Sequence, residues 1–308
     1  MSETRLPFAD RLSLAIVDRQ TPLIVGIDPR PERLPDGLRL DTSIQEPTQT
    51  ADAFETFACE IIDVVAPLVP AIKPQAAFFE MLGPPGMVAL GKVIDYAVDH
   101  GLLVILDGKR NDIGSTATAY ATGWLGRKPQ SAWGCDALTV NPYLGDDSLQ
   151  PMIDHAIHSA TGLFALVKTS NPGSNTFQEL VSDNDPLYRH VGRWIQQAAA
   201  ATSGDSGYGV IGAVVGATHP AHLTELRELM PNTLFLVPGY GAQGGAAADI
   251  APAFDDRGGG AVVNSSRAII FAWEHEKYSG CSSWLAAVES ATKDAAQELG
   301  EVAGLQSD

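Results

Sequence analysis

Residues 102–114 have the sequence LLVILDGKRNDIG, in which five consecutive aliphatic residues, Leu102 to Leu106, are followed at once by charged and polar ones. An apolar run without alternation is typical of a strand buried on both faces, as in a parallel sheet covered by helices. The run is far shorter than the roughly 20 residues that a membrane helix needs. This stretch therefore predicts a buried parallel strand whose carboxyl end carries charge.

Similar short apolar or β-branched runs recur along the chain, and stretches of helical periodicity separate them. Eight strands alternating with helices over about 250 residues predict an α/β fold, a closed (β/α)8 TIM barrel. An open doubly wound sheet is the alternative, but Asp28, Pro29 and Arg30 stand where its Gly-rich turn would follow the first strand. The predicted barrel strands, within residues 23 to 264, are 23–27, 68–72, 102–106, 137–140, 163–167, 210–215, 233–237 and 261–263.

No linker divides the chain, so we expect one domain over residues 1–308. The first and fifth βα connections are long and include polar insertions at 36–50 and 171–186. Insertions of this size usually border the functional site of a barrel. We expect helix 8–18 to plug the bottom of the barrel and helix 284–299 to close the fold.

Acidic residues outnumber basic ones by 37 to 20, which gives a formal net charge of −17. A sequence-independent nucleic-acid binder needs a basic face, so nucleic acid is excluded as a partner. An anionic ligand would require a few basic residues concentrated in one cleft. Three widely spaced cysteines, no secretory signal and no membrane span together predict a cytoplasmic protein.

Charged residues gather around the end of the third strand, where a parallel barrel carries its functional groups. Asp107 and Lys109 are two apart and so point to the same side, Asp112 follows at the loop-to-helix transition, and Lys73 ends the neighbouring strand. A surface ion pair with a helix N-cap at Asp112 or Ser115 is the plain alternative. Two ammonium groups and two carboxylates at one mouth are costly to desolvate unless the function uses them, which favours a charge array for catalysis.

A phosphate site is indicated by VPGYGAQGG at 237–245 and NSSR at 264–267, after the last two strands. Glycines expose backbone N–H groups, Arg267 can fork onto an oxyanion, and TIM barrels usually bind phosphate at this position. The stretch KTSNPG at 168–173 carries hydroxyls and an amide that suit a heterocycle or a sugar. A glycine-rich loop alone is often only a turn, but its coincidence with Arg267 favours phosphate binding, whereas the stretch 168–173 is equally compatible with a Pro-Gly turn capped by hydroxyls. The seven histidines show no metal-binding spacing, so we expect no metal site.

The pattern D-x-K-x-x-D-I at 107–113, with Lys73 upstream, P-G-x-G-x-Q-G-G at 238–245 and a final Arg267, resembles the orotidine 5′-phosphate decarboxylase family. The likeness spans all eight predicted strands, and KPQAAFFE at 73–80 is similar to the longer-chain bacterial subgroup. D-x-K-x-x-D alone is shared with related sugar-phosphate decarboxylases on the same barrel. The Gln-Gly-Gly loop together with Lys73 is not their pattern.

The resemblance implies decarboxylation of orotidine 5′-monophosphate (OMP) to uridine 5′-monophosphate (UMP) and CO2 without a cofactor, as the last step of pyrimidine nucleotide synthesis. It makes Lys109 the group that stabilises and protonates the C6 carbanion, with Asp107 near the departing carboxylate and Lys73 and Asp112 completing the array. It also implies a homodimer with shared active sites. The resemblance implies that Asp28 and Lys73 contact the ribose, that Ser170 contacts the pyrimidine and that Pro238 forms the pocket wall. It implies that Gln243 and Arg267 bind the phosphate, with Gly244 and Ser266 as further binding residues. It places Asp112, Ile113 and Thr116 in the partner subunit's site.

Two other functions stay open at this point: a metal-dependent sugar-phosphate decarboxylase or epimerase on the same barrel, and a non-catalytic sensor of phosphate ligands. The chain departs from shorter family members at Tyr240, where they often carry a small aliphatic residue, and at Ser266, where they carry glycine. Neither departure removes a charge from the expected site.

Overall fold

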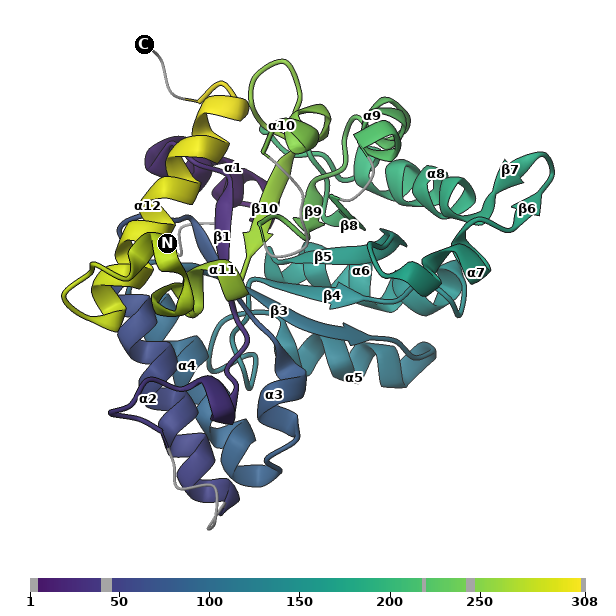
Figure 1. Ribbon diagram of the computed structural model, residues 1–308. Helices are drawn as coiled ribbons and strands as arrows, with labels where there is room; N and C mark the ends of the chain where they lie inside the picture. Colours follow the sequence, from purple (N-terminus) through teal and green to yellow (C-terminus); the bar gives the residue numbers. More distant parts are fainter. Residues whose placement is uncertain (1–4, 40–45, 218–219, 242–246, 306–308) are drawn as a thin grey trace.

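The structure is a computed structural model that describes residues 5–39, 46–217, 220–241 and 247–305. Within them, eight parallel strands pair side by side and close into a barrel (Figure 1). The predicted TIM barrel is therefore confirmed, and the open doubly wound sheet is wrong. The barrel strands are β1 (Leu23–Ile27), β2 (Ala71–Pro74), β3 (Leu103–Arg110), β4 (Ala137–Val140), β5 (Gly162–Lys168), β8 (Ile211–Val215), β9 (Phe235–Pro238) and β10 (Ala261–Ser265).

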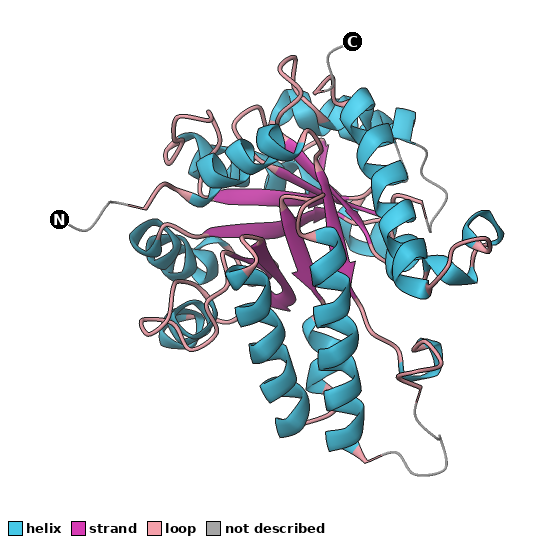
Figure 2. Cartoon of the chain, turned by 90° about the vertical axis from the view of Figure 1, so that its left-hand side faces the viewer, coloured by secondary structure: helices cyan, strands magenta, loops and turns pink. Residues whose placement is uncertain are grey.

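Helices form a layer outside the barrel (Figure 2), and at least one helix separates each barrel strand from the next along the chain. Strands β1 and β8 are buried at every residue, which explains their apolar runs without alternation. The surrounding helices are α2 (Pro47–Val65), α3 (Ala76–Glu80), α4 (Pro84–Asp99), α5 (Gly114–Trp124), α6 (Asp146–Ser159), α7 (Asn175–Gln178), α8 (Leu187–Ala200), α9 (Pro220–Leu229), α10 (Ala247–Ile250), α11 (Arg267–Ile270) and α12 (Trp284–Val302).

Helix α1 (Phe8–Arg19) closes the amino-terminal end of the barrel, as the sequence predicted. The rings of Phe8 and Phe164 meet edge to face with centroids 6.0 Å apart. A Cβ on Gly162, at the start of β5, would overlap the ring of Phe8, so only glycine fits there. The apolar face of α1 thus completes the interior of the barrel from below.

A buried ion-pair network fastens the same end. Asp136, just before β4, is fully buried, and its Oδ1 contacts both Arg5 and Arg11, the latter at 2.7 Å. Its Oδ2 accepts a hydrogen bond of 3.0 Å from the main-chain N–H of Val104. Because the carboxylate is satisfied on both oxygens, its burial is compensated and α1 is tied to two barrel strands.

Leu12→Ala is expected to lower the free energy of unfolding by about 2–5 kcal/mol, because it leaves a cavity beneath the barrel. Leu12 is 0% exposed, whereas Leu14 on the same helix is 60% exposed. Leu14→Ala carries the same change in helix propensity and is expected to cost less than about 0.5 kcal/mol. Urea unfolding of both variants measures the difference, and equal losses would show that α1 does not seal the barrel.

Several predicted boundaries are wrong by a few residues. Leu68 and Val69 belong to the turn before β2, so Lys73 lies inside that strand rather than after it. Helix α12 continues to Val302 instead of ending at residue 299. The polar segment 36–50 ends as helix, because Pro47 suits the first helical position and begins α2, while residues 40–45 of the segment lie outside the described ones.

The fifth connection carries the expected insertion. It contains a 3-10 turn at Pro172–Ser174, helix α7, and a hairpin of β6 (Val181–Ser182) and β7 (Asp185–Pro186). Figure 1 shows this hairpin projecting beyond α7 and α8. The insertion therefore forms part of the rim that follows β5.

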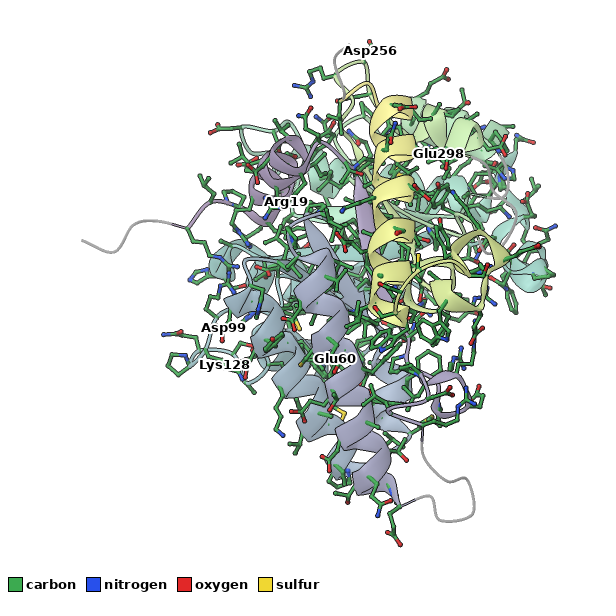
Figure 3. All side chains as sticks on the ribbon, turned by 60° about the vertical axis from the view of Figure 1, so that its left-hand side comes forward. Arg19, Glu60, Asp99, Lys128, Asp256 and Glu298 are labelled. Atoms are coloured by element: carbon green, nitrogen blue, oxygen red, sulfur yellow. The ribbon has the colours of Figure 1, made fainter. Side chains whose placement is uncertain are left out.

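Charged side chains cover the outer layer of the molecule. Figure 3 shows Glu60 on α2, Asp99 at the end of α4 and Glu298 on α12 at the outside of the fold. Across the described part of the chain, none of the helices combines the length and the hydropathy required to cross a bilayer.

Candidate active site

Lys73, Asp107 and Lys109 form one cluster, here called the charge array. Lys73 Nζ lies 2.8 Å from Asp107 Oδ2, and Lys109 Nζ lies 2.5 Å from Asp107 Oδ1. Lys73 comes from β2 and the other two from the carboxyl end of β3. The structure therefore brings together three of the four charged groups that the sequence singled out.

Two neutral side chains complete the surroundings of the Asp107 carboxylate. Gln75 Nε2 donates to Oδ2 at 3.1 Å, and the hydroxyl of Thr139 on β4 donates to Oδ1 at 2.9 Å. Neither residue belongs to a sequence motif that predicts a role for it. Thr139 lies within the strand run ALTV, where a threonine is indistinguishable from an ordinary β-branched strand residue.

The electrostatics of the array favour the ionised forms of Asp107 and Lys73. Burial by itself would raise the pKa of Asp107, but the ammonium groups of Lys73 and Lys109 outweigh it and hold that pKa far below its usual range. Burial would likewise lower the pKa of Lys73, but Asp107 and then Asp28 raise it above the ordinary value. Asp107 is a carboxylate and Lys73 an ammonium ion at neutral pH.

The two lysines differ in access. The side chain of Lys73 is 5% exposed, whereas that of Lys109 is 46% exposed. Lys73 is therefore the more enclosed charge beside Asp107, and the ammonium group of Lys109 is the more accessible of the two.

Two buried acceptors near the array have no hydrogen-bond partner among the described residues. These are Oδ1 of Asp28, which follows β1, and Oδ1 of Asn264 on β10. Gly26 permits the close approach of these strands, because a Cβ there would lie 2.8 Å from the Cβ of Ser266 and 3.0 Å from Asn264 Oδ1. Unsatisfied buried acceptors are costly, and hydroxyl groups of a sugar are suitable donors for them.

The expected phosphate loops follow β9 and β10. Arg267 is exposed and forms no ion pair with the described part of the chain. Ser266 Oγ donates to the carbonyl of Gly26 at 3.2 Å, so this hydroxyl ties β10 to β1. Pro238 ends β9 and is half-buried, while Gln243 and Gly244 lie outside the described residues.

Tyr240 does not enter the mouth of the barrel. Its side chain is 8% exposed, and its hydroxyl donates to Glu298 on α12. The unusual tyrosine in the glycine-rich loop therefore anchors that loop to the outer helix layer.

Ser170 is held by a network at the end of β5. Gly216 packs against it so closely that a Cβ there would lie 2.9 Å from both its nitrogen and its Cβ. The preceding Lys168 is buried, with its Nζ 2.6 Å from Glu179 and 3.1 Å from Asn175 Oδ1. These contacts fasten helix α7 to the segment that presents Ser170.

Asp112 lies apart from the charge array in its own chain. Its Oδ1 accepts a hydrogen bond of 2.8 Å from the N–H of Ile113 and makes no contact with the array. The alternative of a helix N-cap at Asp112 or Ser115 is wrong: Ile113 is the N-cap residue of α5, without a side-chain cap, and Ser115 lies inside the helix. Ile113 and Thr116 are exposed.

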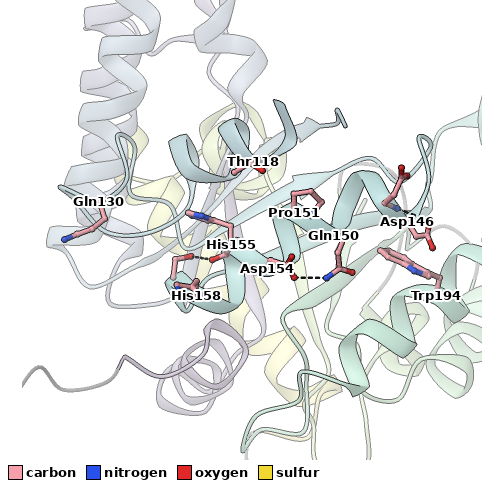
Figure 4. A pocket seen from close by; sticks show the side chains of 11 residues that line it. Thr118, Gln130, Asp146, Gln150, Pro151, Asp154, His155, His158 and Trp194 are labelled. Atoms are coloured by element: carbon pink, nitrogen blue, oxygen red, sulfur yellow. Dashed lines mark hydrogen bonds between the residues drawn. The ribbon is translucent and has the colours of Figure 1, made fainter. Parts of the chain in front are cut away.

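A cavity of about 940 Å³ lies on the flank of the barrel, between α5, α6 and α8 (Figure 4). Thr118, His155 and Trp194 line it, and Gln150 Nε2 donates across one wall to Asp154 at 2.7 Å. No member of the charge array is among its lining residues. This space is a surface groove, separate from the cluster at the strand ends.

Comparison with known proteins agrees with this geometry. The model of the Orotidine 5'-phosphate decarboxylase / HUMPS family matches residues 21–278. The chain is 51% identical to the orotidine 5'-phosphate decarboxylase of Rhodopirellula baltica, over 96% of this chain and 99% of that one. It is 41% identical to the corresponding protein of Deinococcus radiodurans, over 86% and 89% of the two chains.

Solved structures extend the agreement to three dimensions. The structure of Leishmania donovani OMP decarboxylase superposes with a TM-score of 0.75 at 31% identity and covers 97% of this chain and 100% of that chain. A shared fold alone does not settle an activity, but here the family match, the identities and the charge array agree. The chain belongs to the orotidine 5'-phosphate decarboxylase / HUMPS family.

Proposed function

We propose that this protein decarboxylates OMP to UMP and CO2, with Lys109 as the group that meets the charge developing at C6. The decarboxylation itself, in pyrimidine nucleotide synthesis, follows from the family to which the chain belongs, and the residue roles are our proposal. The observation that carries them is the Asp107 carboxylate held between the buried ammonium group of Lys73 and the exposed one of Lys109.

The reaction breaks the bond between C6 and the carboxylate, and the electron pair stays on C6. The pyrimidine ring delocalises that pair poorly, so fixed charge must stabilise it. Lys109 Nζ supplies the positive charge and then transfers one proton to C6, which gives UMP and a neutral amine that regains its proton from water. Because Asp107 holds the ammonium group in place beforehand, little reorganisation is needed in the transition state.

The rest of the substrate is bound by residues at the strand ends. Asp28 and Lys73 hold the ribose hydroxyls, which the unpartnered Oδ1 of Asp28 supports. Ser170 binds the pyrimidine edge, and Pro238 forms the pocket wall. Phosphate binding far from C6 supplies energy that helps to close the loops. The residues proposed for the phosphate and its loop are Gln243, Gly244, Ser266 and Arg267.

We further propose a homodimer in which Asp112, Ile113 and Thr116 complete the partner subunit's site. Ile113 is 58% exposed, and further apolar side chains lie open on the connections after β4 and β5. Among them are Tyr143 and Phe177, which are 73% and 57% exposed, with ring centroids 6.3 Å apart. Exposed apolar patches of this kind mark interaction surfaces, and a second copy of the chain is the partner that would use Asp112.

Membership of the longer-chain bacterial subgroup and a cytoplasmic location stay predictions of the sequence. So does a reaction without metal or cofactor. Within the described residues, no three His, Cys, Asp or Glu side chains are grouped so that they could hold a metal ion.

The ultraviolet absorbance change of OMP tests the proposed function. We expect wild-type protein to turn over OMP at the same rate with and without EDTA. Turnover of a keto-acid sugar phosphate that requires Mg²⁺ would support the rival enzyme. Tight UMP binding in a calorimeter without OMP turnover would indicate a sensor instead.

A further inference from the structure

Strand β3 departs from regular pairing at the charge array. It pairs with β4 at Leu106 opposite Leu138 and again at Arg110 opposite Val140, so four steps along β3 match two along β4. The surplus length is the segment that carries Asp107 and Lys109. Bulges are rare between parallel strands, and they recur next to active sites because they re-aim side chains.

Lys109 is also in a left-handed backbone conformation, with φ of +45°. Five non-glycine residues of the described chain have positive φ. Gln20 and Ala160 end helices, and Asp183 and Asn184 form the turn of the β6–β7 hairpin. Lys109 is the one among these five that lies in a barrel strand, and a residue with a Cβ adopts this conformation there only when its surroundings impose it.

Thr139 bridges the bulge from β4. Its Oγ1 accepts the Lys109 N–H at 2.9 Å and donates its proton to Asp107 Oδ1 at 2.9 Å. The directions of both bonds are fixed, because an amide N–H can only donate and a carboxylate can only accept. Thr139 is 1% exposed, which leaves little access for a water molecule to replace the hydroxyl.

We propose that Thr139 is a positioning residue for the decarboxylation. Its hydroxyl holds the left-handed backbone of Lys109 and the orientation of the Asp107 carboxylate at the same time, and thereby aims Lys109 Nζ at C6. Thr139 acts through these two residues and does not itself touch the reacting atoms. This inference rests on the proposed function and adds a residue to it.

Thr139→Val tests the inference, because valine has nearly the same shape but neither donates nor accepts. We expect kcat for OMP to fall about 10- to 100-fold while KM changes less than about threefold, since the lost bonds include one to a charged group that acts in the transition state. Thr139→Ser keeps the hydroxyl and is expected to retain kcat within about threefold. Thr139→Ala removes the hydroxyl with less volume and serves as a second variant if the valine protein does not fold.

A matched control is Thr292→Val on α12. Thr292 is also buried, and its hydroxyl donates to the Val288 carbonyl at 2.7 Å, far from the array in the sequence and on another element. We expect its kcat to be unchanged. Calorimetric binding of UMP to Thr139→Val is expected to stay within about threefold of wild type, which separates positioning from a general loss of the site.

The possible outcomes are distinct. If wild-type protein turns over OMP and Thr139→Val does so equally fast, the inference alone is overturned. The same holds if Thr139→Ser is as slow as Thr139→Val, since the methyl group and not the hydroxyl would then matter. If wild-type protein shows no turnover, the proposed function and this inference fall together.

Discussion

Lys109→Met is expected to decarboxylate OMP about 10⁴- to 10⁷-fold more slowly than wild-type protein, because it removes both the proton donor and the positive charge at C6. General acid catalysis contributes roughly 10²–10⁴ and a pre-placed charge roughly 10²–10³, and the two multiply. Without the positive charge of Lys109, the negative charge of Asp107 also repels the substrate carboxylate more strongly. The measurement is single-turnover decarboxylation followed by ultraviolet absorbance.

The variant should fold, since the Lys109 side chain is 46% exposed and Asp107 keeps Lys73, Gln75 and Thr139 as partners. Lys92→Met on α4 is the matched control, because that lysine pairs with Glu55 at the surface and its loss is expected to leave kcat unchanged. A Lys109→Met rate within tenfold of wild type would remove Lys109 from the chemistry.

A mixture of Asp112→Ala and Lys109→Met proteins is expected to regain activity that neither has alone. Asp112→Ala by itself should lose about 10²- to 10³-fold, as when one electrostatic group is removed from a catalytic site. If each site combines Lys109 of one subunit with Asp112 of the other, a mixed dimer holds one intact site. Random exchange of equal amounts then restores about one quarter of the wild-type activity.

Exchange must be shown independently, for instance by mass spectrometry of differently labelled subunits. The control mixes Asp112→Ala with the double variant Asp112→Ala/Lys109→Met, where no intact site can form and no recovery is expected. If the first mixture also stays inactive after exchange is proven, each site is built from a single chain and the shared-site dimer is wrong.

Most of the barrel was predictable because its strands are buried on both faces and so consist of unbroken apolar runs. The run at 102–106 marks β3 directly. The predicted bounds of the second strand began too early, because Val69 is apolar and fully buried but lies in the turn before β2 and pairs with no neighbouring strand of the described chain. An apolar run in the sequence indicates that residues are buried, but it does not indicate that they pair with a neighbouring strand.

The site was predictable where charge was concentrated and less so where neutral groups act. Lys73, Asp107 and Lys109 stand out because charges gathered at the ends of buried strands are costly to desolvate unless the function uses them. Thr139 and Gln75 do not, since their importance depends on contacts across strands that sequence spacing does not encode. The bulge at Asp107 to Lys109 was also invisible, because it is a property of the pairing with β4 and not of the residues in β3 alone.

The plug formed by α1 has a practical consequence for work with this protein. The proposed substrate site lies at the opposite end, so a fluorophore or an immobilising linker attached at the end closed by α1 would leave the approach to Lys109 clear. Shortening the chain past Arg19 is a different matter. It would remove the helix that closes the barrel and expose the ring of Phe164 to solvent, whereas that ring is now buried against Phe8.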